Sequence, residues 1–202
     1  MGDPDLRFAA LGPEHAVAYL HAHPEISDVL LTGGDPMVMS TDRLREHLEP
    51  FLAVDSARTI RIGTRSVAYW PQRFVTDADA DDVLRLFARV VASGRTLAVM
   101  GHYSHEVELA PEVARRAVSR IRDTGAIIYC QASLIAQVND DASTWERLWR
   151  AELSAGMVPY YIFMAGTPGL MTTSGSPLTA PCASSRMPTA RCRDSRAPCA
   201  AR

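Results

Sequence analysis

Apolar and polar positions along residues 1–165 follow a pattern that predicts strands and helices in turn. Short apolar runs that stop at glycine or at polar residues predict buried strands at residues 28–32, 59–62, 96–100, 126–130 and 158–163. Before and between these runs, helical spacing of apolar residues and helix-end signals predict helices at residues 13–22, 41–52, 77–93, 111–124 and 144–155. A strand that recurs about every 30 residues, with a helix before the next strand, is typical of right-handed βαβ units. The pattern therefore predicts an α/β fold with a parallel sheet of about five strands and flanking helices.

Two of the predicted helices carry recognisable end signals. Helix 111–124 opens with Pro111 and is followed by Gly125, which matches the preference for proline at the start of a helix and glycine just past its end. Ser143 and Glu146 have the spacing of a capping box for helix 144–155. The Asn139-Asp140-Asp141 segment before that helix is also expected to serve in capping.

The last part of the chain, residues 166–202, has a different composition. It contains no Val, Ile, Phe, Tyr or Trp and is rich in Pro, Ser, Thr, Ala and Arg. Such a segment cannot bury enough apolar surface to offset its chain entropy, so a disordered, low-complexity tail is expected. A second hypothesis is a frameshift near residue 165, because permitted codons shifted by two bases encode an aromatic and β-branched continuation. The sequence thus predicts a globular domain over residues 1–165 and a separate tail.

Composition and charge exclude several classes of function. The formal net charge of −2 gives no electrostatic footprint for nucleic acid or for an anionic membrane. No apolar run approaches the roughly 20 residues of a membrane span, and the acidic N-terminus lacks the apolar region of a signal peptide. A cytoplasmic protein is therefore expected. The chain has no lysine, which rules out an internal Schiff base with pyridoxal phosphate (PLP).

The cysteines also limit the chemistry. None of the four has C-x-x-C spacing, so the usual zinc and iron–sulfur signatures are missing. Cys130 lies in an apolar run and is expected to be a buried core thiol. His102 and His105 are three positions apart, but no third ligand is evident, and no metal site is predicted.

Polar residues and glycines gather just after the predicted strands. The segments are Thr32-Gly33-Gly34-Asp35, Gly63-Thr64-Arg65, Gly101-His102-Tyr103-Ser104-His105 and Gln131. In β/α folds the carboxyl ends of parallel strands form the edge at which sites are built. These segments are therefore the candidates for a binding or catalytic site.

Two of these candidates have alternative explanations. Gly33 and Gly34 allow a ligand to approach the backbone closely, and Asp35 offers a carboxylate to a ligand ammonium group. A tight turn capped by Asp35 explains the same residues. Arg61 and Arg65 suit recognition of a carboxylate or phosphate, and a solvated or salt-bridged arginine pair is the alternative.

Seven motifs, taken together in order and spacing, carry a family resemblance. They are Asp28–Pro36, Arg61–Arg65, Pro71–Arg73, Gly101–His105, Gln131, Val138–Asp140 and Pro159–Ile162. Over roughly residues 3–165 the chain resembles the lysine 2,3-aminomutase family of radical S-adenosylmethionine (SAM) enzymes. The resemblance implies a partial (β/α) barrel of the radical SAM type.

The resemblance also implies chemistry and residue roles. In the intact family a [4Fe-4S] cluster on a C-x-x-x-C-x-x-C motif cleaves SAM to a 5′-deoxyadenosyl radical, and PLP on a lysine assists 2,3-migration of the amino group of a small amino acid. The resemblance places Gly33, Gly34 and Asp35 at the SAM methionine amine, His102 and Gln131 in the SAM pocket, Arg61 and Arg65 at SAM or a phosphate, and Tyr160 and Tyr161 near the substrate.

The chain departs from the family at both cofactors. The cluster motif and the PLP lysine are absent from its 202 residues. We therefore expect a fragment of an aminomutase-like protein that is itself inactive, with an uncovered sheet edge, marginal stability and a tendency to aggregate. The alternatives are a non-catalytic SAM- or nucleotide-binding domain, or an unrelated β/α enzyme that uses His102 and an arginine pair on a phosphorylated substrate.

Overall fold

The computed structural model describes residues 12–164. All five predicted strands are present: β1 (Asp28–Leu31), β2 (Thr59–Thr64), β3 (Thr96–His102), β4 (Ile127–Ser133) and β5 (Val158–Phe163). The α-helices are α1 (Pro13–Ala22), α2 (Thr41–Leu48), α3 (Ser66–Tyr69), α4 (Ala80–Ala92), α5 (Glu112–Asp123) and α6 (Ala142–Ser154). The expected tail, and the domain boundary drawn before it, lie outside the described residues.

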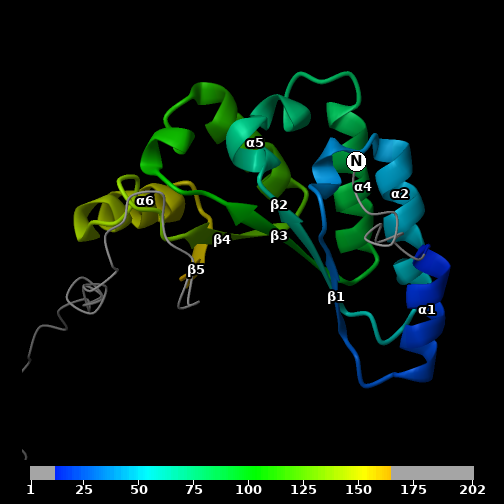
Figure 1. The fold of residues 1–202 in the computed structure, drawn as a ribbon. Coiled ribbons are helices and arrows are strands. Elements are labelled where there is room, and N and C mark those ends of the chain that lie inside the picture. The colour runs from blue at the N-terminus through cyan, green and yellow to red at the C-terminus, as the bar shows by residue number, and fades with distance from the viewer. Residues whose placement is uncertain (1–11, 165–202) are drawn as a thin grey trace, which may run out of the picture.

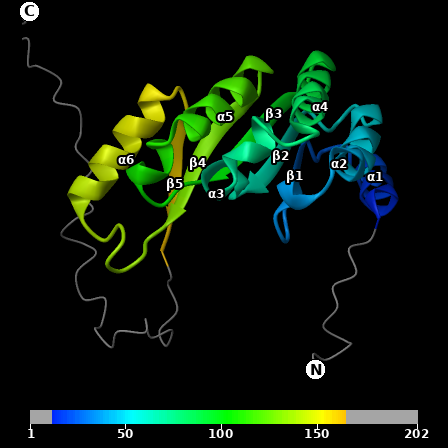
Figure 2. The ribbon, with the colours of Figure 1, turned by 90° about the horizontal axis from the view of Figure 1, so that it is seen from above.

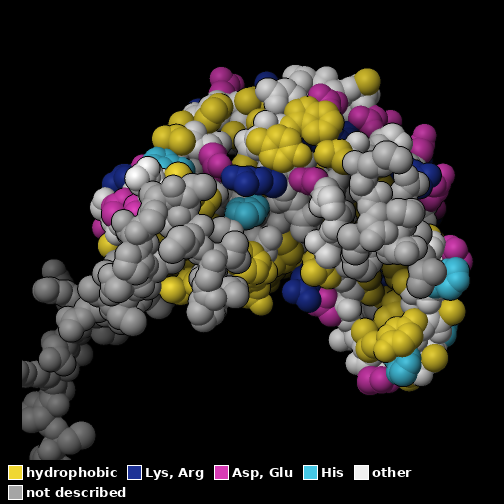
Figure 3. Space-filling model, viewed as in Figure 1, with side chains coloured by type: hydrophobic (Ala, Val, Ile, Leu, Met, Phe, Trp, Pro, Cys, Tyr) yellow, Lys and Arg dark blue, Asp and Glu magenta, His cyan; other side chains and the backbone are white. Residues whose placement is uncertain are grey.

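The five strands form one parallel sheet in sequence order, β1-β2-β3-β4-β5. This confirms the predicted α/β class. Each strand lies next to the one that precedes it in the chain, which is the order found in the wall of a β/α barrel. Figures 1 and 2 show the helices along one side of a curved sheet. The opposite face forms a hollow, which Figure 3 shows from the side.

Strand alternation separates the two faces of the sheet. Ile60 and Ile62 of β2, and Ile128 and Cys130 of β4, point toward the helices and are buried in the core. The prediction that Cys130 is a core thiol is confirmed. On the other face the edge strand is accessible, as Leu30 of β1 illustrates at 48% exposure, while Ala98 and Met100 of the central β3 are buried. The helix side therefore holds the core, and the hollow is open to a ligand.

Several predicted boundaries were wrong in an informative way. Gly63 and Gly101 were expected to end their strands, but β2 continues to Thr64 and β3 to His102. Gly101 is needed inside the strand, since an added Cβ would lie 3.2 Å from the Val67 side chain. Gln131 likewise lies within β4 and not after it. His102 and Gln131 thus have directions set by strand alternation.

The helices show three smaller differences. The predicted helix 41–52 changes at Leu48 into the 3-10 turn Glu49–Ala53, which carries a proline in its first turn. Helix α4 begins at Ala80, three residues later than predicted, after the 3-10 turn Pro71–Phe74 and a loop. The short helix α3 was not predicted.

The start of α6 corrects the predicted capping box. The helix begins at Ala142, and the N-cap is Asp141 and not Ser143. The Asp141 carboxylate accepts a hydrogen bond from the Thr144 N–H at 3.0 Å. Hydrogen bonds from the Ser143 and Thr144 hydroxyls, with that backbone bond, hold the pKa of Asp141 well below its usual range. The expectation that the segment 139–141 serves in capping is confirmed at Asp141.

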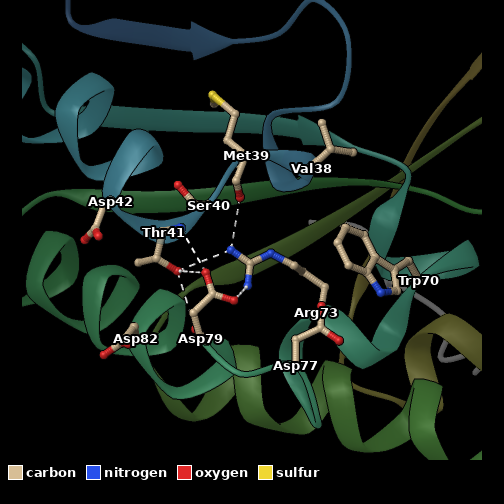
Figure 4. Close-up of a pocket in the computed structure, with 10 residues that line it drawn as sticks. All are labelled: Val38, Met39, Ser40, Thr41, Asp42, Trp70, Arg73, Asp77, Asp79 and Asp82. Carbon is tan, nitrogen blue, oxygen red and sulfur yellow. Dashed lines mark hydrogen bonds and ion pairs between the residues drawn. The ribbon is translucent and has the colours of Figure 1, made fainter.

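A buried arginine joins the loop after β1 to the loop after β2. Arg73 is 1% exposed; its Nη1 donates to Asp79 Oδ1 at 2.7 Å and its Nε to the Met37 carbonyl at 2.9 Å. Its Nη2 donates to the Met39 carbonyl and to Thr41 Oγ1, each at 3.2 Å. Thr41 in turn donates to Asp79 Oδ2 through both its N–H, at 2.9 Å, and its hydroxyl, at 2.7 Å. Figure 4 shows this cluster beside a pocket of about 400 Å³ on which Asp42, Asp77 and Asp82 also border.

Within residues 12–164, no helix combines the length and the apolar character that crossing a membrane requires.

Candidate functional site

The register of the sheet places four of the predicted site residues in one row. Thr64, the last residue of β2, lies opposite Gly101, and Arg65 directly follows it at the start of α3, where its charge acts on His102. His102 lies opposite Gln131, and Gln131 lies opposite Tyr161. Residues that pair across neighbouring strands point to the same face. Arg65, His102, Gln131 and Tyr161 therefore form a row along the carboxyl end of the sheet, which we call the rim row.

His102 is a half-buried polar residue of the rim row. Its Nε2 atom is buried and has no hydrogen-bond partner within the described residues. Burial, followed by the positive charge of Arg65, lowers the pKa of His102 below its ordinary value, so the imidazole is neutral at pH 7. A neutral imidazole carries one donor and one acceptor nitrogen. An unpartnered buried nitrogen at this position is available to a ligand.

The two candidate arginines lie in different surroundings. Arg61 Nε donates to Asp28 Oδ1 at 2.8 Å, which corresponds to the salt-bridge alternative. The exposed Arg65 guanidinium makes no hydrogen bond or ion pair with the described residues. Four residues of strand separate the two arginines by about 13 Å. The structure therefore does not bring them together as a pair.

Asp35 occupies the centre of a hydrogen-bond cluster between the ends of β1 and β2. Its carboxylate accepts from the N–H groups of Met37, Arg65 and Ser66 and from the hydroxyls of Thr64 and Ser66, at distances listed here in that order: 3.0, 2.8, 3.0, 2.7 and 3.0 Å. A carboxylate has about four lone-pair sites, so these donors saturate it. The geometry corresponds to the turn-capping alternative for Asp35. The partners lie 29–31 residues away, apart from Met37; Thr64 was part of a candidate segment, but its bond to Asp35 was not predicted and Ser66 was missed.

Gly33 and Gly34 form an open loop next to Asp35. Both have positive φ, +93° and +56°, a conformation that side chains rarely adopt. Nothing lies within 4 Å of the position that a Cβ would take at either residue. Their carbonyl groups accept no hydrogen bond within the described chain. The loop therefore presents free backbone acceptors to a ligand.

The predicted substrate-side tyrosines lie at the end of the sheet. A register shift between Cys130 and Gln131 sets Tyr161 opposite Gln131 and leaves Tyr160 at the irregularity. The Tyr160 ring packs against Tyr129 at 5.3 Å and against Tyr161 at 4.9 Å between centroids. Both tyrosines are exposed. Tyr160 thus adds a second aromatic ring beside Tyr161 at the end of the rim row, and an apolar or stacking ligand would contact both rings.

The residues present do not form a site for a metal cluster or for PLP. The part of the chain that the structure describes holds no group of three or more His, Cys, Asp or Glu side chains suited to a metal ion. Cys130 faces the helices and contacts Met157 at 3.9 Å between sulfur atoms, and His105 Nδ1 accepts from the Val107 N–H. These residues do not fit a [4Fe-4S] cluster, and a sequence without lysine does not fit PLP.

The chain is similar in sequence to several curated aminomutases. No protein-family model matches it. It is 34% identical over 145 residues to a protein of Aquifex aeolicus whose name provisionally assigns it as an L-lysine 2,3-aminomutase, and 31% identical over 147 residues to the L-lysine 2,3-aminomutase of Escherichia coli. It is 27% identical over 152 residues to the glutamate 2,3-aminomutase of Clostridioides difficile.

These matches cover 72%, 73% and 75% of this chain but 38%, 40% and 34% of the respective relatives. The chain thus spans about two fifths of the length of the first curated relatives that it matches. Its parallel sheet and these similarities agree with the resemblance read from its motifs. The chain belongs to the lysine 2,3-aminomutase family of radical SAM proteins.

Proposed function

We propose that this chain is the SAM-binding part of an aminomutase-like radical SAM protein and that the rim row, with the Gly33-Gly34 loop, holds SAM. The observation that carries the proposal is the unpartnered, buried Nε2 of His102 next to the free guanidinium of Arg65. Both lie at the carboxyl end of a parallel sheet, in a chain related to lysine and glutamate 2,3-aminomutases. Unused polar groups at such an edge are expected of a binding site that is formed before its ligand arrives.

The residues present fit the polar groups of SAM. The free carbonyls of Gly33 and Gly34 accept from the methionine ammonium group, in the region that the motif comparison assigns to it. His102 and Gln131 contact the adenosine part. Asp35 acts as a positioning residue, since its carboxylate is saturated by the loops that it joins. Tyr160 and Tyr161 border the side on which the substrate of the whole protein binds.

The whole protein of this type is proposed to be an isomerase that shifts the amino group of a small amino acid. In such a whole protein a [4Fe-4S] cluster and PLP, whose ligands would come from residues outside this chain, would supply the radical and amino-carrying chemistry beside the SAM that the rim row holds. The 202 residues of this chain contain no C-x-x-x-C-x-x-C motif and no lysine. We therefore expect the chain by itself to bind SAM without cleaving it.

The first prediction is binding without turnover. The purified 202-residue chain is expected to bind SAM in equilibrium dialysis with a dissociation constant on the order of micromolar. After anaerobic reconstitution with iron and sulfide it is expected to yield no 5′-deoxyadenosine, because its sequence contains no C-x-x-x-C-x-x-C motif. The Escherichia coli relative, treated in the same way, is the positive control.

Two results would contradict this proposal. Formation of 5′-deoxyadenosine by the chain would contradict the expectation that it cannot cleave SAM. Absence of SAM binding by the folded chain would show that the rim row is not a SAM site. Tighter binding of ATP than of SAM would favour the alternative of a nucleotide-binding domain.

A further inference from the structure

We propose that Arg73 is a positioning residue for the SAM site: it fixes the segment that follows the Gly33-Gly34 loop and thereby holds this loop in its ligand-binding conformation. The inference rests on the proposed function and adds to it a residue that is itself buried. The Pro71–Arg73 motif contributes no side chain to the rim row, and Arg73 lies in the 3-10 turn Pro71–Phe74. Its effect on a ligand is therefore transmitted through other residues.

The guanidinium of Arg73 holds the main chain of one short segment. Its Nε donates to the Met37 carbonyl at 2.9 Å and its Nη2 to the Met39 carbonyl at 3.2 Å. Its Nη1 is held in turn by Asp79 Oδ1 at 2.7 Å. A rigid, planar group that donates from three nitrogens keeps its acceptors at fixed distances from one another. Arg73 therefore determines the path of residues 37–39.

Met37 connects Arg73 to Asp35. Its carbonyl accepts from Arg73, and its N–H donates to Asp35 Oδ1 at 3.0 Å. The Met37 side chain is fully buried in the core. Asp35 is the N-cap of the 3-10 turn Pro36–Val38 and directly follows Gly34. The position of Asp35, and with it the exit of the glycine loop, thus depends on Arg73.

The Gly33-Gly34 loop has little support of its own. Nothing lies within 4 Å of the position that a Cβ would take at either glycine, and both have the positive φ that glycine adopts freely. The chain enters the loop from β1, whose last residue, Leu31, pairs with Ile62. A loop without side-chain contacts takes its conformation from its two ends. The end at Asp35 is the one that Arg73 holds, and such supporting contacts keep a binding site in its productive geometry.

Two variants of the full chain change this support to different extents. Arg73→Lys keeps a positive charge beside Asp79, but a single ammonium group cannot replace the fork that binds the Met37 and Met39 carbonyls. Arg73→Met removes the charge as well. Arg73→Lys is the main test, because it retains the counter-charge of a buried carboxylate and is the more stable of the two.

The matched control is Arg95→Met. Arg95 also donates to two main-chain carbonyls, those of Ala57 at 2.9 Å and Val54 at 3.1 Å, but it directly precedes β3 at the opposite, amino end of the sheet. The two ligands are S-adenosylhomocysteine, which carries the amino-acid group, and 5′-methylthioadenosine, which lacks it. Calorimetry measures the dissociation constants, and circular dichroism confirms that each variant is folded.

Arg73→Lys is expected to weaken binding of S-adenosylhomocysteine by about 10-fold, the effect of losing one net hydrogen bond. Binding of 5′-methylthioadenosine is expected to stay within about twofold, because this nucleoside has no ammonium group for the glycine carbonyls. Arg95→Met should leave both dissociation constants within about twofold, because its site is distant from the loop. A residue that only stabilises the fold would change the binding of both nucleosides alike.

Hydrogen exchange of the wild-type chain without ligand gives a second measurement, which does not depend on the folding of a variant. The Met37 amide is expected to exchange slowly, because its N–H is bound by Asp35 and its carbonyl by Arg73. In Arg73→Lys the same amide should exchange faster, while amides of β3 stay protected.

Three results would overturn the inference: wild-type affinity of folded Arg73→Lys for S-adenosylhomocysteine, equal losses for the two nucleosides, or rapid exchange of the Met37 amide in the wild-type chain. Each of them leaves the proposed SAM site intact, because the wild-type chain still binds. Failure of the wild-type chain to bind either nucleoside would instead contradict the proposed function and, with it, the role of Arg73.

Discussion

Replacement of Arg73 by methionine is expected to lower the free energy of unfolding by about 2–4 kcal/mol. Methionine keeps most of the buried volume but removes a guanidinium that binds Asp79, Thr41 and the carbonyls of Met37 and Met39. The variant leaves the Asp79 carboxylate without its counter-charge and two carbonyls without a donor. The loss is therefore a matter of unpaired polar groups and not of cavity volume.

Chemical denaturation of the wild-type chain and of Arg73→Met measures this difference. Arg85→Met is the matched control, because Arg85 lies on α4, pairs with Asp82 and has a side chain that is 69% exposed. Exposed pairs of this kind contribute at most about 1 kcal/mol. Similar losses for the two variants would show that the buried cluster does not hold the two loops together.

Replacement of Glu152 by glutamine is expected to stabilise the chain by roughly 3 kcal/mol at pH 8. Glu152 lies on α6, is 2% exposed, and its Oε2 has no hydrogen-bond partner within the described residues. Burial, together with the negative charge of Glu108, raises the pKa of Glu152 from its ordinary 4.5 to about 7. Cys130 and Tyr103 also face it, and neither supplies a positive charge.

The sign of the pH dependence follows from this raised pKa. The folded chain binds the Glu152 proton more tightly than the unfolded chain does, so protonation favours the fold. The contribution is complete below about pH 4.5 and is lost as the pH rises through about 7. Glutamine resembles the protonated form at every pH. The variant should therefore match the wild-type chain near pH 4.5 and exceed it in stability at pH 8.

Urea denaturation of the wild-type chain and of Glu152→Gln at pH 5 and pH 8 tests the expected pH dependence. Glu146→Gln on the same helix is the control, because Glu146 is exposed and pairs with Arg150. A difference between Glu152→Gln and the wild-type chain that is the same at both pH values would contradict the assigned pKa.

Periodicity was sufficient to predict the class of the fold. All five strands and the parallel order follow from apolar runs at regular spacing, because burial on the helix side selects such residues. The strand ends were harder to predict, since Gly63 and Gly101 were expected to end strands that continue past them. A side chain at Gly101 would crowd Val67 and Ile128, which come from distant parts of the chain.

The sequence was sufficient to predict which residues belong to the candidate site, but not which hydrogen bonds and ion pairs they form. His102 and Gln131 were recognised as candidates, and the register brings them together. The saturation of Asp35 depends on Thr64, Arg65 and Ser66, about 30 residues away, and the neutralisation of Arg61 depends on Asp28 across two strands. Contacts of this kind follow from the exact register, which hydrophobic patterns do not specify residue by residue.

Hydrogen exchange of the full chain with and without S-adenosylhomocysteine tests the location of the SAM site most directly. The account predicts slower exchange in the rim segments, residues 32–35, 63–66, 101–105 and 129–133, where free polar groups and the glycine loop lie. Helix α4 and the pocket around Arg73 are expected to exchange as before. Protection confined to that pocket, or no protection anywhere at a saturating ligand concentration, would contradict the assignment of the rim row as the SAM site.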